Sequence, residues 1–198
     1  ALLARLSVKD SLAVKPLCAC LAALARDLRQ EFYPFLQPRV MPVLLQLLDV
    51  QDAEQLEDAF SCMAFLFKFL LRFVIDDFTS IFDLLFSILR HKQWYIRKFC
   101  AEVVSYLIRK LPTERLETAL SHVLSSATTA MVPDLDALSA PLSVYALAHK
   151  RKEVEEGVSQ LLFEAVKGVQ NGFHSKFPAI ASTLVALVPG RAGVRERR

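Results

Sequence analysis

The apolar residues of this chain recur every three or four positions, which is the spacing of one face of an α-helix. The pattern is strongest between Asp52 and Val74, where apolar side chains also fill most of the remaining helix surface. A helix that is apolar on nearly all sides must be buried on several sides. The sequence therefore predicts an all-α protein, with Phe60 and Phe67 buried between neighbouring helices and Asp52 as the N-cap of its helix.

The same arrangement of apolar residues returns about 40 positions further along the chain, a repeat length typical of HEAT and armadillo units with two helices each. Residues 93–111 then align with 53–71, so that Leu107 takes the place of Phe67. Such units stack one on another, and each pair covers its neighbours. We therefore predict a HEAT/armadillo-like α-solenoid of about four to five antiparallel helix pairs.

Turn and capping signals divide the chain into these pairs, with breaks expected near Pro34, Asp76, Asp77 and Pro112. A HEAT-repeat segment of a larger array is expected over residues 1–188, with helix pairs at about 11–49, 52–90, 93–130 and 133–174 and a last helix at 177–188. The first and last helices are apolar, whereas the end of a solenoid needs a polar cap, which favours an excerpt from a longer array. Residues 189–198 are polar and basic, and we expect them to be frayed.

Composition and spacing exclude several classes of protein. The chain is 54% hydrophobic, yet no uncharged run has the apolar character and the length of about 20 residues that a membrane span needs. The four cysteines and four histidines show no disulfide or metal-ligand spacing, so we expect free, buried thiols and no bound metal. Neither a phosphate-binding glycine motif nor a nucleophile elbow occurs. We therefore expect no enzyme activity, no cofactor, no small-molecule substrate and no membrane contact.

Basic residues gather near the ends of the predicted helices. Repeated positions of a solenoid line up along one rim, so separate pairs of cations could add up to a stripe that follows phosphates. The alternative is that lysine and arginine near helix ends are there only because they interact favourably with the helix dipole. The net charge of +3 is small for a nucleic-acid-binding protein, which agrees with this alternative. The candidate residues for contact with RNA or another partner are Arg90, Lys92, Arg97, Lys98, Arg109, Lys110, Lys150, Arg151 and Lys152.

Trp94 and Tyr95 lie among these basic residues. Aromatic rings between cations can stack on the bases of a nucleic acid. Large aromatic side chains in a helical repeat also fill the space between helix pairs, and we expect Trp94 and Tyr95 to be wedged there.

Several stretches resemble one particular family. They are RDLRQEFYPF (26–35), HKQWYIRKFCAEVVSYLIRKL (91–111) and EGVSQLLFEAVKGVQNGFHS (156–175). They are similar to the N-terminal region of the down-regulated-in-metastasis family, very large HEAT-repeat proteins of the small-subunit processome that associate with a small nucleolar RNA. The resemblance covers about 23–176, with no clear match over 113–151.

The resemblance implies a nucleolar scaffold in ribosome biogenesis, within the nucleus, that supports pre-rRNA processing and small-subunit rRNA maturation without enzymatic activity. It also implies other processome proteins, with pre-rRNA or small nucleolar RNA, as partners.

A second function class stays open from the residues alone. It is a HEAT-repeat adaptor that binds only proteins, as karyopherin-like or signalling repeats do, without RNA contact. An all-helical enzyme would need a perturbed pair of ionisable groups in a cleft. The acidic clusters at 76–77 and 153–156 are explained by helix capping and solvated helix faces instead.

Overall fold

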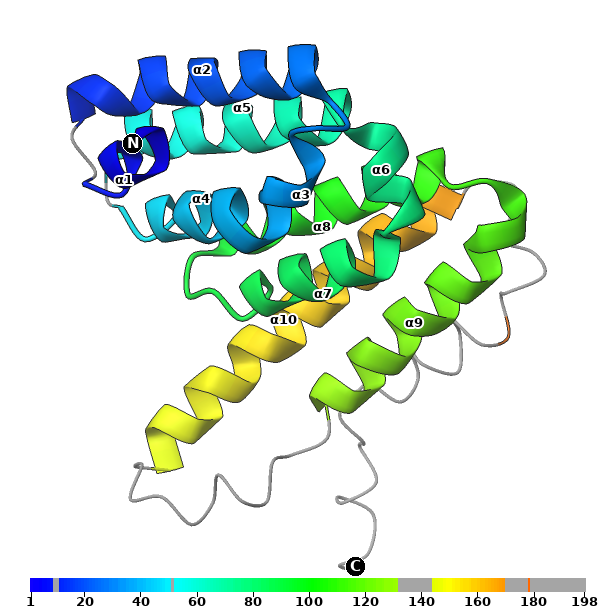
Figure 1. Ribbon diagram of the computed structural model, residues 1–198. Coiled ribbons are helices and arrows are strands. Elements are labelled where there is room, and N and C mark those ends of the chain that lie inside the picture. Colours follow the sequence, from blue (N-terminus) through cyan, green and yellow to red (C-terminus); the bar gives the residue numbers. More distant parts are fainter. Residues whose placement is uncertain (9–10, 51, 132–143, 170–177, 179–198) are drawn as a thin grey trace, which may run out of the picture. The chain divides into compact units, whose positions relative to one another are not determined.

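The computed structural model describes residues 1–8, 11–50, 52–131, 144–169 and 178, and these residues are helical apart from short connections (Figure 1). The prediction of an all-α fold is confirmed for this part of the chain, which contains no strand. The number of helix pairs stays a prediction. The chain consists of two compact units, Ala1–Ile81 and Phe82–Arg198.

The first unit is built around two long helices that lie side by side, α2 and α5 (Figure 1). Apolar residues of both helices, among them Leu21 and Ala25 of α2 and Leu66 of α5, are buried. The helices of this unit, in order, are α1 (Leu2–Leu6), α2 (Ser11–Leu28), α3 (Tyr33–Phe35), the π-helical turn η1 (Leu36–Val40), α4 (Met41–Leu47), α5 (Ala53–Phe69), α6 (Leu71–Asp76) and the first residues of α7 (Phe78–Ile88).

Prolines explain why the segment after α2 is broken into short pieces. Pro34 and Pro42 stand in the first turns of α3 and α4, where the missing backbone N–H is not needed. Pro38 stands inside η1. A proline within a regular α-helix removes a hydrogen bond and clashes with the carbonyl one turn earlier, so the irregular turn falls where a regular helix cannot continue.

The start of α5 is capped as predicted. The Asp52 carboxylate accepts hydrogen bonds from the backbone N–H groups of Glu54 and Gln55, at 2.9 and 3.3 Å. These groups have no partner within the helix, so the carboxylate supplies one. The Asp52 prediction is therefore confirmed.

The end of α5 differs from the sequence prediction. The apolar pattern continues to Val74, but the helix stops at Phe69 because Leu70 has φ −99° and ψ 13°, outside the helical range. Leu70 is fully buried, so packing holds this break in place. Neither glycine nor proline marks it in the sequence.

Asp77 lies at the next break, between α6 and α7, as predicted. Its carboxylate accepts hydrogen bonds from the Tyr33 hydroxyl at 3.0 Å, the Gln37 side-chain amide at 2.7 Å and the Ser80 hydroxyl at 2.7 Å. The carboxylate thus joins the turn before α7 to α3 and η1. Burial, together with the bond to Asp77, raises the pKa of the Tyr33 hydroxyl above its usual range, so this hydroxyl stays a donor.

The second unit contains the rest of α7 together with α8 (Trp94–Lys110), α9 (Thr113–Met131) and α10 (Val144–Val169). Helices α8 and α10 pack along each other (Figure 1). His122 of α9 reaches α7, since its Nε2 lies 2.6 Å from an Asp83 carboxylate oxygen and its ring meets the Phe82 ring edge-on. Pro112 precedes α9, where the sequence predicted a turn.

Part of the predicted organisation lies outside the described residues. This applies to the last helix at 177–188, of which only residue 178 is described, and to the tail at 189–198. Within the predicted pair at 133–174, the described part is one continuous helix of 26 residues, α10. Among the described helices, none combines the length with the apolar character that a membrane span requires.

The cysteines are free thiols, as predicted, but they are not all buried. Cys18, Cys62 and Cys100 are buried and Cys20 is exposed. The correction for Cys20 follows from helix geometry, because two positions along α2 turn the side chain by about 200° away from Cys18. Burial raises the pKa of the Cys100 thiol, and a hydrogen bond with Cys18 together with burial raises that of Cys62.

Helix α10 approaches the end of α7 so closely that only glycine fits at the crossing. A Cβ atom on Gly157 would overlap the backbone carbonyl oxygen of Leu89 and would lie 3.3 Å from Cδ of Arg97. The missing side chain therefore sets the separation between α10 and the loop that leads into α8.

Truncation of Phe67 tests the packing of the core around α5. Its side chain is 1% exposed, so Phe67→Ala should lower the free energy of unfolding of the 198-residue chain by about 3–5 kcal/mol through the cavity it leaves. Urea denaturation measures this loss. Phe65, 45% exposed on the same helix, is the control, and Phe65→Ala should lose less than about 1 kcal/mol. Equal losses for the two variants would contradict the packing described.

Phe60 was expected to be as buried as Phe67, but it is only partly buried. The loss of free energy of unfolding in Phe60→Ala should therefore lie between the losses in Phe65→Ala and Phe67→Ala.

Gly157→Ala separates local helix propensity from packing. Propensity alone would make alanine more favourable than glycine by about 1 kcal/mol in a helix. The overlap with the Leu89 carbonyl predicts the opposite sign, a loss of about 1–3 kcal/mol. Thermal unfolding monitored by circular dichroism decides between them. Ser159→Ala, an exposed change two positions along α10, should leave the transition nearly unchanged.

Candidate binding surface

The predicted basic residues divide into two groups on α8 and a third on α10. Arg90, Lys92 and Lys98 are exposed around the beginning of α8. Arg109 and Lys110 are exposed at its other end, about 24 Å away at 1.5 Å per residue. The predicted rim is thus not one continuous patch along this helix.

The third group belongs to α10. Lys152 is exposed, and its Nζ lies 3.8 Å from a Glu156 carboxylate oxygen. Lys150 and Arg151 are in the same helix, but their side chains lie outside the described residues.

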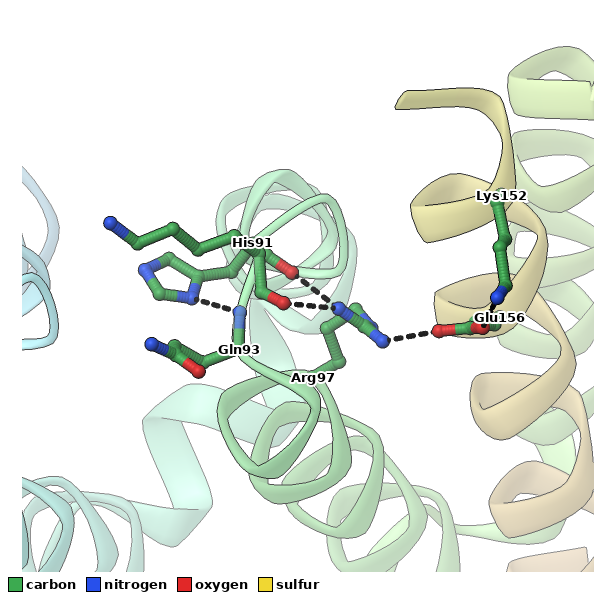
Figure 2. Close-up of polar contacts among 6 residues, drawn as sticks. His91, Gln93, Arg97, Lys152 and Glu156 are labelled. Atoms are coloured by element: carbon green, nitrogen blue, oxygen red, sulfur yellow. Dashed lines mark hydrogen bonds and ion pairs between the residues drawn. The ribbon is translucent and has the colours of Figure 1, made fainter. Parts of the chain in front are cut away.

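Arg97 differs from the other candidates because its guanidinium points into the fold (Figure 2). The side chain is 5% exposed. It donates hydrogen bonds to the backbone carbonyls of His91 and Lys92, at 2.7 and 3.0 Å, and to Glu156 at 2.6 Å. Arg97 therefore joins the loop before α8 to α10. Its guanidinium does not form part of the exposed surface that the other cations offer to a partner.

The loop before α8 is held by one more contact. The Gln93 backbone N–H donates to Nδ1 of His91 at 3.1 Å (Figure 2). Together with the two Arg97 bonds, this contact fixes the backbone from His91 to Gln93. The positions of Lys92 and Trp94 relative to α8 follow from it.

The two aromatic residues at the start of α8 are exposed, which corrects the expectation that they are wedged between helix pairs. Trp94 is 63% exposed and Tyr95 is 36% exposed. Their rings meet edge-on, with centroids 6.1 Å apart, and Lys98 Nζ lies 6.0 Å from the Trp94 ring centroid. They point outward because the inward positions of this turn are taken by Ile96 and Arg97.

A hollow of about 540 Å³ lies between α8 and α10, next to Trp94. Six of the seven residues that line it carry a charged or polar group, and the stems of these side chains and the Trp94 ring also contribute apolar surface. The walls are formed by Trp94, Arg97, Lys98, Glu155, Glu156, Ser159 and Gln160. The acidic residues of 153–156 were expected on a solvated face, and Glu156 is indeed about half exposed, but it also carries the ion pair to Arg97.

The first unit has a different hollow, of about 370 Å³, between α2 and α5. Cys18, Ala22, Phe65 and Phe69 are among the side chains that line it. No sequence pattern predicts this hollow, because its walls come from scattered apolar and polar positions of two helices. Among the described residues, no group of three or more His, Cys, Asp or Glu side chains could hold a metal ion.

The sequence does contain a sign that Arg97 is buried. Residues 100, 101, 104 and 108 follow Arg97 at helical spacing and are all apolar, so position 97 falls on the buried face of α8. Its partner Glu156 had no such signal, because 59 positions separate the two residues.

Arg97→Lys tests whether Arg97 acts as a structural bridge. Lysine keeps the charge but lacks the planar fork that reaches two carbonyls and a carboxylate together, so the free energy of unfolding should fall by about 1–3 kcal/mol. Urea denaturation measures the loss. Lys98→Arg changes an exposed neighbour and should have almost no effect, and a stable Arg97→Lys protein would argue against the bridge.

No family model matches the sequence of this chain. It is 28% identical over 180 residues to U3 small nucleolar RNA-associated protein 20 of Saccharomyces cerevisiae, and 25% identical over 178 residues to the protein of the same name from Schizosaccharomyces pombe. Each alignment covers 89% of this chain and 6% of the yeast protein. The chain therefore spans a small fraction of the length of the relatives it matches.

Proposed function

We propose that this chain is a segment of a non-catalytic helical-repeat scaffold of the small-subunit processome, which supports pre-rRNA processing and small-subunit rRNA maturation in the nucleolus. The observation that carries the proposal is the similarity, over 89% of the chain, to two proteins named for their association with the U3 small nucleolar RNA. The all-helical structure of the described residues supports it, because packed helices offer extended surfaces to partners.

The mechanism is geometric. Helices held in fixed positions by contacts such as those of Arg97 and Gly157 present exposed side chains to neighbouring molecules. The partners in this proposal are processome proteins and pre-rRNA or small nucleolar RNA. The contact residues are Arg90, Lys92, Lys98 and Lys152, with Arg109, Lys110, Lys150 and Arg151 as further candidates, and Arg97 holds the surface in place.

The full-length protein tests this proposal directly. Purified through an affinity tag from cells, it should enrich the U3 small nucleolar RNA and sediment with large pre-ribosomal particles. Its depletion should lower mature small-subunit rRNA relative to large-subunit rRNA. Re-expression of the unchanged protein should restore the ratio.

Two results would count against the proposal. One is a full-length protein that purifies with other proteins but without U3 RNA, which would favour a protein-only adaptor. The other is an unchanged ratio of the two rRNA species after depletion.

A further inference from the structure

The beginning of α8 combines exposed aromatic rings with exposed cations on a backbone that is held in place. We propose that this corner, consisting of Arg90, Lys92, Trp94, Tyr95 and Lys98 and named here the α8 corner, binds single-stranded RNA, with a base stacked on Trp94 and phosphates on the cations. The biological setting of this inference rests on the proposed function. The binding itself is argued from the geometry of the corner alone.

The exposure of Trp94 is the first reason. An indole ring loses stabilisation when most of its surface stays in water, and tryptophan is enriched where it meets a binding partner. Trp94 is 63% exposed, at the edge of a hollow rather than under a neighbouring helix. The planes of Trp94 and Tyr95 are 79° apart, so Tyr95 meets the indole edge-on and does not cover it as a stacked ring would.

The sign of the local charge is the second reason. The stretch 90–98 contains four lysine and arginine residues and no acidic residue. Arg97 is used inside the fold, which leaves Arg90, Lys92 and Lys98 as the exposed cations of this stretch. Among them, Lys98 has its Nζ 6.0 Å from the Trp94 ring centroid. Cations that alternate with open aromatic faces are the arrangement by which proteins hold single strands, with stacking for bases and lysine or arginine for phosphates.

Two acidic residues near the corner, Glu156 and Glu102, already have cationic partners. Glu156 accepts from Arg97 and lies 3.8 Å from Lys152. Glu102 lies 3.8 Å from Lys98, one turn further along α8. An incoming phosphate can compete with Glu102 for the half-exposed Lys98, because an exposed ion pair of this kind contributes little free energy.

The rigidity of the corner is the third reason. Arg97 fixes the carbonyls of His91 and Lys92, and Gln93 is bonded to the His91 ring (Figure 2). A loop that is already ordered loses less conformational entropy when a ligand binds. Arg97 is thus a positioning residue for Lys92 and Trp94 and does not itself touch the RNA.

A protein partner fits this corner less well. The core of a protein–protein interface is depleted of lysine, glutamate and serine, and its anchoring aromatic side chains sit in well-packed, desolvated pockets. The hollow beside Trp94 is lined by Arg97, Lys98, Glu155 and Glu156 and by the polar Ser159 and Gln160. RNA bases stacked on a ring need no apolar pocket, since their edges stay in contact with polar groups and water.

The chain has a single tryptophan, so its fluorescence reports on this corner directly. The probe is an unstructured oligouridylate of about 12 nucleotides, within the length that such single-strand sites occupy. Titration into the 198-residue chain should quench the Trp94 emission. Trp94→Ala should weaken binding, followed by anisotropy of a labelled oligouridylate, about tenfold or more, and Trp94→Phe should restore part of the affinity.

The matched control is Phe163→Ala. Phe163 is a 60% exposed aromatic residue on α10 with Lys167 over its ring, so it has the same type of neighbour and similar exposure. Its removal should leave the affinity unchanged. Lys92→Ala and Lys98→Ala should each make the slope of log affinity against log salt concentration less negative by about 0.7. The urea midpoint of every variant checks that the fold is retained.

Several outcomes would overturn the proposal. They are an absence of quenching, equal losses for Trp94→Ala and Phe163→Ala, and equal affinity for a double-stranded RNA of the same length, which would indicate charge alone. A photo-reactive amino acid at position 94 of the full-length protein that crosslinks to protein and not RNA would also overturn it. In each of these cases, enrichment of U3 RNA with the full-length protein would still support the proposed function.

Discussion

The guanidinium of Arg97 links α8, which carries it, to two other parts of the second unit. It satisfies two carbonyls of the loop before α8, and it pairs with Glu156 on α10. A buried charge without partners would be strongly unfavourable, so the loop and α10 must lie where Arg97 can reach both. Gly157, next to Glu156, allows the close approach that this reach requires. The exposed residues at the start of α8 take their positions from this arrangement.

Asp77 has a corresponding role in the first unit. Its carboxylate receives hydrogen bonds from three side chains and holds the break between α6 and α7 against α3 and η1. In both units, a single charged side chain satisfies polar groups at a place where regular helix stops. Backbone and side-chain donors near such breaks lack helical partners, and one multidentate group supplies several bonds at once. The apolar contacts between helices can then extend up to the break.

The apolar periodicity was sufficient to predict helices, because the spacing of buried side chains depends on local geometry. Pro34, Asp52 and Pro112 marked helix starts or breaks correctly for the same reason, since their effects act within one turn. The break at Leu70 could not be predicted, because no local residue type causes it and packing alone holds it. The exposure of Cys20 was predictable from the two-residue spacing to Cys18.

At the candidate site, some features can be predicted from the sequence and others depend on the packing of distant segments. The sequence alone determined that the chain is helical, that cations gather near 90–98 and that two aromatic residues stand among them. Which of these side chains face solvent depends on how distant helices pack. Arg97 turned inward because Glu156, 59 positions away, lies opposite it, and Trp94 stayed outside because Ile96 and Arg97 fill the inner positions of that turn. Burial depends on which distant segment packs on a helix face, and local spacing carries no information about that segment.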